Sequence, residues 1–188
     1  EIIPINETDV KESISVLNKT RNNIFSSNLE EDNVSLGLAS WIKTIPLIYY
    51  PWGLQAAGIR FKNALQENAK MHALIEDVVE ASHNGIVAWE KKSEVFPILL
   101  QGDDDNIKTK ERWKVLKIYF DENNIEYKEI ISIKGNILSK LIHLIYLLDY
   151  TSIYKAVISK IDPTPVKSIE FIKSRLEEWI PTTTLKGH

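Results

Sequence analysis

A chain of 188 residues has the length of one globular domain or slightly more. Its composition, 44% hydrophobic and 26% charged, excludes a disordered or collagen-like protein. Cysteine is absent, which excludes disulfides and cysteine-based zinc sites and is compatible with a reducing, cytoplasmic compartment. The net charge of -3 provides no basic field for nucleic acid or an anionic membrane, so neither is an expected partner.

The first 44 residues predict two helices as a lead-in to the rest of the chain. Asn6 or Thr8 can cap the first helix, and Asn33 can cap the second. Apolar residues at helical spacing predict which side of the first helix faces inward. These residues are Val10, Ile14, Leu17 and Ile24.

Residues 45–160 alternate between short apolar runs and longer amphipathic stretches. The runs predict strands at 45–50, 73–79, 95–100 and 126–133, and helices at 54–69, 81–91, 108–122 and 135–160. Such alternation is typical of an α/β fold, a three-layer α/β/α sandwich with a parallel sheet. Residues 161–188 are expected to form a last helix, reaching about Trp179, and a frayed tail.

No targeting or membrane-spanning segment is expected. The most apolar stretch, Leu141 to Leu148, is far shorter than the roughly 20 residues of a spanning helix and predicts a buried helix instead. His143 lies within that stretch and is expected to be a hydrogen-bonded core or interface residue.

The usual signatures of nucleotide-binding proteins, zinc proteases and serine hydrolases are missing. Two other features have alternative interpretations. The acidic run at 101–106 follows a strand and fits either a Mg²⁺ site or, as we favour, a solvated turn that caps the next helix. Arg60, Asn63 and Glu67 share one polar flank of the 54–69 helix, which fits either a charged surface or a functional site.

Ligands of open parallel sheets bind outside the carboxyl ends of the strands. The segments expected to hold a site are therefore 51–67, 80–85, 101–107 and 134–136.

Three motifs resemble one enzyme family. R-x-K-N-x-x-x-E-N-A-K runs from Arg60 to Lys70, His83-Asn84 follows, and the D-P segment at Asp162 precedes Lys173 at the family's spacing. Together they resemble the archaeal and bacterial bifunctional phosphoglucose/phosphomannose isomerases, which have the sugar-isomerase (SIS) fold. The resemblance covers nearly the whole chain but only the C-terminal half of the family's usual length.

The resemblance implies isomerisation of glucose 6-phosphate, and possibly of mannose 6-phosphate, to fructose 6-phosphate through a cis-enediolate. It implies that Glu67 is the catalytic base, that His83 opens the sugar ring and that Lys173 stabilises developing oxygen charge. A histidine in the first turn of the 81–91 helix would be kept neutral by the helix dipole. No metal or organic cofactor is implied. The implied substrate-binding residues are Arg60, Asn63, Asn84 and Thr164.

The resemblance also implies an assembly. The partners are an N-terminal SIS domain of the same protein and a second subunit, which supplies the histidine. The expected homodimer interface includes the 81–91 helix and the helix around Leu141 to Leu148. The family's enediolate-binding arginine would lie upstream of Glu1. Because the catalytic groups would be divided between chains, we expect this piece to be inactive alone. The alternative is a regulatory SIS module that binds sugar phosphate without turnover.

Two positions depart from the family pattern. Gly85 stands where the family often has Glu, and Val166 aligns with a threonine linked to tolerance of mannose.

Overall fold

The computed structural model describes residues 5–179, so the predicted tail at 180–188 lies outside the described residues. Four parallel strands form one sheet in the order β2-β1-β3-β4. The strands are β1 (Ile45–Tyr50), β2 (Leu74–Asp77), β3 (Val95–Gln101) and β4 (Lys128–Ile131). The helices are α1 (Glu7–Ile24), α2 (Val34–Trp41), α3 (Gln55–Asn68), α4 (Val78–Ala81), the 3-10 helix η1 (Gly85–Glu90), α5 (Ile107–Glu122), α6 (Ile137–Ile158) and α7 (Lys167–Trp179).

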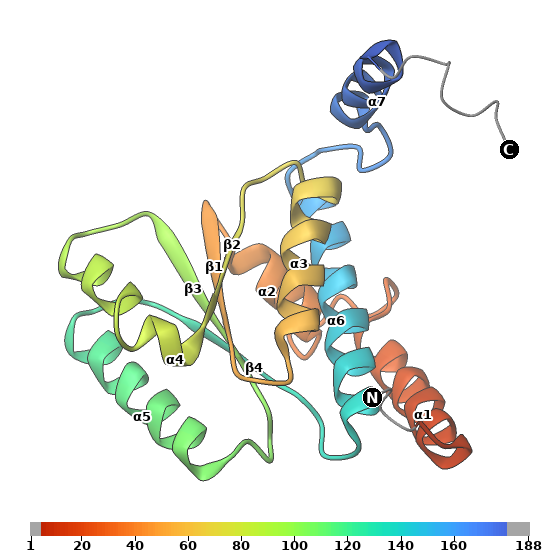
Figure 1. The fold of residues 1–188 in the computed structure, drawn as a ribbon. Coiled ribbons are helices and arrows are strands. Elements are labelled where there is room, and N and C mark those ends of the chain that lie inside the picture. Colours follow the sequence, from red (N-terminus) through yellow and green to blue (C-terminus); the bar gives the residue numbers. More distant parts are fainter. Residues whose placement is uncertain (1–4, 180–188) are drawn as a thin grey trace, which may run out of the picture.

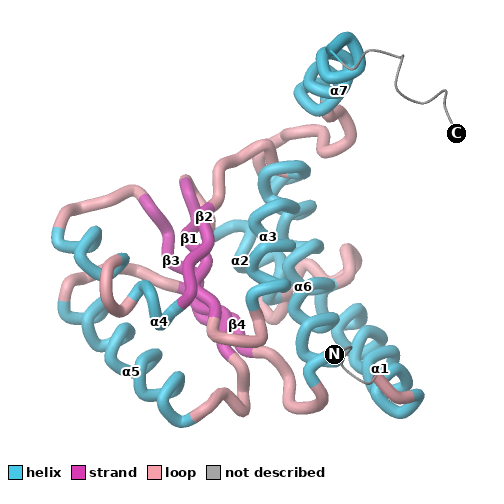
Figure 2. Tube along the Cα trace, in the orientation of Figure 1, coloured by secondary structure: helices cyan, strands magenta, loops and turns pink. Residues whose placement is uncertain are grey.

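Helices cover both faces of the sheet, so the three-layer α/β/α architecture with a parallel sheet is confirmed. On one face, α4 and α5 pack over a cluster that includes Tyr49, Leu99 and Trp113. On the other face, α2, α3 and α6 pack over a larger cluster (Figures 1 and 2). Helix α1 lies outside that layer, against α6.

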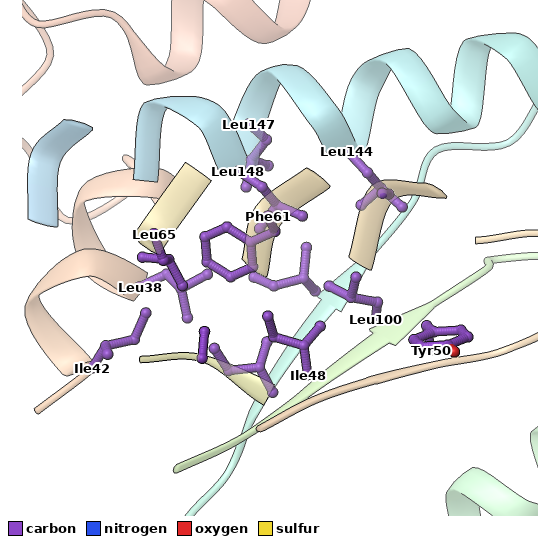
Figure 3. Packing of buried hydrophobic residues seen from close by; sticks show 14 of the residues in the cluster. Leu38, Ile42, Ile48, Tyr50, Phe61, Leu65, Leu100, Leu144, Leu147 and Leu148 are labelled. Carbon is purple, nitrogen blue, oxygen red and sulfur yellow. The ribbon is translucent and has the colours of Figure 1, made fainter. Parts of the chain in front are cut away.

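The larger cluster locks α3 and α6 to the sheet. Leu144, Leu147 and Leu148 of α6 point towards Phe61 and Leu65 of α3 (Figure 3). Phe61, Leu144 and Leu148 have no exposed surface. Because this packing is close, it fixes the positions of α3 and α6 and of the residues at their ends.

Helix α6 is the described helix that is long and apolar enough to cross a membrane, but α1, α2 and α3 pack against it. It is therefore a core helix, and the side chains of Leu141 to Leu148 are buried or half-buried inside their own chain. Leu141, Ile142, Ile145 and Tyr146 are half-buried, so the expected place of this stretch in a subunit interface stays a prediction.

His143 lies on α6 and is buried, but its Nδ1 has no hydrogen-bond partner in the described structure, contrary to the expected bonded histidine. Burial lowers the pKa of His143, because the charged imidazolium loses its hydration there.

Helix α1 begins at the expected cap, where Asn6 accepts from the Asp9 N–H at 2.9 Å. Its inner face differs from the prediction, since Val10 and Ile14 are exposed. Ser13 is buried instead, and its hydroxyl lies 3.1 Å from that of Ser139 on α6. Small hydroxyl residues allow the two helices to approach closely while their polar atoms stay hydrogen-bonded.

The packing of α6 makes a matched pair of variants informative. Leu148→Ala should lower the free energy of unfolding by about 2–5 kcal/mol, because it removes buried methyl groups and leaves a cavity. Val157→Ala on the same helix, where the side chain is 65% exposed, should change it by less than about 0.5 kcal/mol. Urea denaturation measures both, and equal losses would contradict this packing.

Candidate active site

A cavity of about 690 Å³ lies between the last turns of α3 and the segment that leads into α7. It brings together two of the predicted site residues, Asn63 and Glu67, with the D-P segment that carried the family resemblance. The lining residues are Asn63, Gln66, Glu67, Lys70, Asp162, Pro165, Val166, Lys167, Ser168 and Ile169.

This cavity is not at the carboxyl edge of the sheet, where the sequence predicted a site. Helix α3 starts after the carboxyl end of β1 and ends before β2 begins, so Glu67 in its last turn lies at the amino-terminal edge. Figure 1 shows the α3 terminus next to the segment leading to α7, away from α4. The expectation was wrong because it ignored the length of the helix, about 20 Å for its 14 residues.

Lys70 connects the end of α3 to the D-P segment, which form two sides of the cavity. Its Nζ donates to the carbonyl of Glu67 at 2.6 Å and to the carbonyl of Pro163 at 3.2 Å. The backbone of Lys70 has a φ of 53°, in the left-handed region, which turns the chain sharply after α3. Both bonds tie the D-P segment to the end of α3.

The D-P segment is a tight turn. Asp162 accepts from the Thr164 N–H at 2.9 Å. Hydrogen bonds from Thr164 hold the pKa of Asp162 below its usual value, with a further contribution from Lys70. A carboxylate therefore faces the cavity beside a lysine, and Thr164 acts on the turn without lining the cavity.

Arg60 is directed away from the cavity. It forms a two-pronged ion pair with Asp149 of α6, with Nε and Nη2 at 3.0 and 2.9 Å from the carboxylate oxygens. The hydrogen bond to Asp149 raises the pKa of Arg60, and Glu67 contributes a smaller attraction. The predicted charged flank of α3 is present, and Arg60 on it is bonded to Asp149. A substrate-binding role for Arg60 stays a prediction.

Glu67 and Asn63 are exposed in this chain. A general base works best where water is excluded, so the open face of the cavity needs a cover before the site suits proton transfer. Lys173 is also exposed and does not line the cavity, but it lies one helical turn beyond Ile169, which does.

His83 and Asn84 lie near the opposite edge of the sheet. They follow β2 and the single turn of α4, and the His83 N–H donates to the Glu80 carbonyl at 2.9 Å. The expected 81–91 helix is wrong, because α4 ends at Ala81 and η1 begins at Gly85. The dipole argument therefore fails, since His83 follows a helix terminus instead of opening a helix. His83 is exposed.

The departure at Gly85 has a local physical reason. A Cβ at this position would lie 2.5 Å from both carboxylate oxygens of Glu76, so a larger residue would displace that side chain. Burial raises the pKa of Glu76, and Glu80 adds to the effect. The space next to Gly85 is thus occupied by the carboxylate of Glu76.

The acidic run at 101–106 forms the expected capping turn. Asp105 accepts from the Gly102 N–H at 2.9 Å, and Asn106 caps α5 through the Lys108 N–H. Asp103 and Asp104 pair with Lys134 and Lys140. Within residues 5–179, no cluster of three or more His, Asp or Glu side chains is arranged to hold a metal ion.

Sequence reasoning did not select five polar residues of the cavity as site residues. They are Gln66, Lys70, Asp162, Lys167 and Ser168. Lys70 was detectable, because it closes the R-x-K-N-x-x-x-E-N-A-K motif. Lys167 and Ser168 carry no signal of their own and are brought to the cavity by the turn at Asp162.

Comparison with known proteins identifies the family to which the chain belongs. The family described as the C-terminal SIS domain of bacterial phospho-glucose isomerase matches residues 31–176. A bifunctional phosphoglucose/phosphomannose isomerase from Caldicellulosiruptor bescii is 30% identical over 184 residues, or 94% of this chain and 54% of that protein. The enzyme of the same name from Aquifex aeolicus is 26% identical over 137 residues, or 71% and 43%. The chain therefore spans about half the length of these relatives.

A solved structure shows the same fold. A glucose-6-phosphate isomerase like protein from Thermus thermophilus superposes with a TM-score of 0.69 at 16% identity, over 89% of this chain and 56% of that one. The sheet, its helical layers and these matches define an SIS domain. The chain belongs to the family of C-terminal SIS domains of bacterial phosphoglucose isomerases, which confirms the resemblance seen in the sequence.

Proposed function

We propose that this chain is the C-terminal domain of a sugar-phosphate isomerase and that it supplies the catalytic base. The observation that carries the proposal is the position of Glu67 in the cavity between α3 and the D-P segment, beside Asn63 and Lys70. The relatives named as phosphoglucose/phosphomannose isomerases support this reaction class. The proposed reaction converts glucose 6-phosphate, with mannose 6-phosphate as a second candidate, to fructose 6-phosphate.

In the proposed mechanism, the carboxylate of Glu67 removes the proton from C2 of the open-chain aldose. The electron pair moves into the C1–C2 bond and the carbonyl oxygen becomes an enediolate oxygen. Glu67 returns its proton to C1, and the hydroxyl proton moves from O2 to O1, which leaves the ketone at C2. A single carboxylate on one face of the substrate suffices for both transfers.

Two further groups have proposed roles in this mechanism. Lys173 on α7 would place a positive charge near the enediolate oxygens, where charge develops in the transition state. His83 would donate a proton to the ring oxygen of the cyclic sugar, a role that histidine often has as a general acid. None of these steps calls for a metal or organic cofactor.

The proposed site is shared between chains. Glu67 and His83 lie near opposite edges of one sheet, so the histidine that acts with Glu67 would come from a second subunit of a homodimer. An N-terminal SIS domain would contribute the phosphate site. We place the enzyme in the cytoplasm, in keeping with the cysteine-free sequence and the phosphorylated substrate.

The alternative is a regulatory SIS module without turnover. The presence of Glu67, His83 and Lys173 together favours the enzyme, because a sensor has no use for a base. An assay of fructose 6-phosphate formation by the full-length protein discriminates between the two.

Glu67→Gln in the full-length enzyme should lower exchange of the C2 proton by about 10²–10⁴-fold, because the amide cannot accept that proton. Substrate affinity should change little, since the amide keeps the shape of the side chain. Deuterium exchange followed by NMR measures the first and calorimetry the second. Glu122→Gln, which changes another exposed glutamate at the end of α5, is the control and should exchange normally. Near-normal exchange in Glu67→Gln would overturn the proposal.

His83→Ala should slow the cyclic substrate by about 10²-fold or more, the scale of general acid catalysis. An acyclic analogue with the same carbonyl and phosphate needs no ring opening, so its C2 exchange should stay near the wild-type rate. His72→Ala, which removes another exposed histidine, should leave both rates unchanged. Equal losses on the cyclic and acyclic substrates at an unchanged melting temperature would place His83 in proton transfer instead.

A further inference from the structure

Helix α1 is attached to the rest of the chain by few buried side chains. Of its 18 residues, Ser13, Thr20 and Ile24 are buried, and Ile24 alone among them is apolar. Figure 1 shows α1 on the outside of the helical layer, next to the first turns of α6. Because α1 buries so little apolar surface, we expect it to open at a lower free energy than the core of the domain.

A cavity of about 220 Å³ lies between α1, α6 and the segment that leads into α2. It adjoins the imidazole of His143 on α6. The lining residues are Val16, Lys19, Thr20, Asn23, Ile24, Asp32, Val34, Ile133, His143 and Leu147. Since half of these residues belong to α1, water would reach His143 if α1 moved away from α6.

The imidazole of His143 suits this place only while it is neutral. His143 is 9% exposed, and its Nδ1 is buried with no hydrogen-bond partner among residues 5–179. Protonation makes both ring nitrogens donors, so a charged N–H at Nδ1 would be buried without an acceptor. Burying such a charge costs more than burying a neutral group, because the charge loses its hydration. For the same reason burial lowers the pKa of His143.

Neighbouring charges do not compensate a protonated His143. The charged residues that adjacent elements present towards α6 are Glu12, Lys19 and Arg21 of α1, Asp32 before α2, and Arg60 of α3. Glu12 accepts from the Asn136 N–H at 3.3 Å, and Asp32 accepts from the side chain of Asn28 at 3.0 Å. Neither carboxylate is paired with His143 in the described part of the chain, and the other three groups are cations.

We propose that α1 is an acid-sensitive cover of α6, which detaches when His143 gains a proton. Detachment lets water solvate the imidazolium, and the small buried surface of α1 makes this movement easier than any change in the core. Such a switch is independent of the reaction proposed at Glu67. It gives the protein a conformational response to mild acid.

The direction of the response follows from the two protonation equilibria of His143. With α1 detached, His143 has the usual histidine pKa of about 6.5, and with α1 in place that pKa is lower. Well above this pH both forms are neutral, so the ratio of detached to attached α1 does not depend on pH. As the pH falls below about 6.5, the detached form takes up a proton that the attached form does not. The ratio then rises by up to about tenfold per pH unit, until the pH reaches the lowered pKa.

Hydrogen–deuterium exchange of the full-length protein at about pH 7.5 and about pH 5.5 tests this switch. Exchange in peptides from α1, divided by the intrinsic exchange rate at each pH, measures how often α1 opens. In the wild type it should rise by up to about tenfold at the lower pH. Peptides from α5, on the other face of the sheet, should be unchanged. The carboxylates of α1 keep their charge at both pH values, since their usual pKa is about 4.

Two variants of His143 and one control identify the group that titrates. His143→Phe removes the titrating group and keeps an aromatic ring, so opening of α1 should no longer depend on pH. His143→Gln, which is polar and neutral at both pH values, should behave in the same way and serves if Phe disturbs the packing. His72→Phe, which removes an exposed histidine, should respond as the wild type does. A wild-type rise of less than about twofold, or a wild-type response in both His143 variants, would overturn the proposal.

Discussion

The crossover from β1 through α3 to β2 determines how the candidate site is divided. Because β1 and β2 are parallel neighbours, the chain must return from one edge of the sheet to the other between them, and α3 makes that return. A residue in the last turn of α3 and a residue that follows β2 therefore lie near opposite edges. Glu67 is the first kind of residue and His83 is the second.

The cavity around Glu67 is anchored by packing and hydrogen bonds on one side and is exposed on the other. Phe61 and Leu65 anchor α3 against the leucines of α6, and Lys70 ties the end of α3 to the segment before α7. The carboxylate of Glu67 remains exposed. If a partner chain supplies the rest of the site, this chain has to position the Glu67 carboxylate, and the partner has to exclude water from it.

Much of the fold was predictable because long periodic elements are determined by burial. Residues 45–50 are apolar on both faces and form a central strand, and the Asn33 cap opens α2 as expected. The short elements were not predictable in the same way. Residues 81–91 contain too few helical turns for periodicity to distinguish an α-helix from the turn and 3-10 helix observed.

Two of the predicted site residues line the cavity, whereas the place of the cavity in the fold was not predictable from the sequence. The motif from Arg60 to Lys70 identified Glu67 and Asn63, both of which line the cavity. To predict where the cavity lies, the length of α3 had to be taken into account. To predict the ion pair between Arg60 and Asp149, the packing of α3 on α6 had to be known. Such contacts, between residues 89 positions apart, leave no mark in local sequence.

The central claim is that a working site takes Glu67 from one chain and His83 from another. Subunit complementation tests it most directly: full-length Glu67→Gln and His83→Ala, each nearly inactive on the cyclic substrate, are unfolded together, refolded and assayed. In a mixed dimer one site has both defects and the other has none, so random pairing should restore about a quarter of wild-type activity. A mixture no more active than the two variants assayed apart would show that both residues act within one chain and would contradict the account.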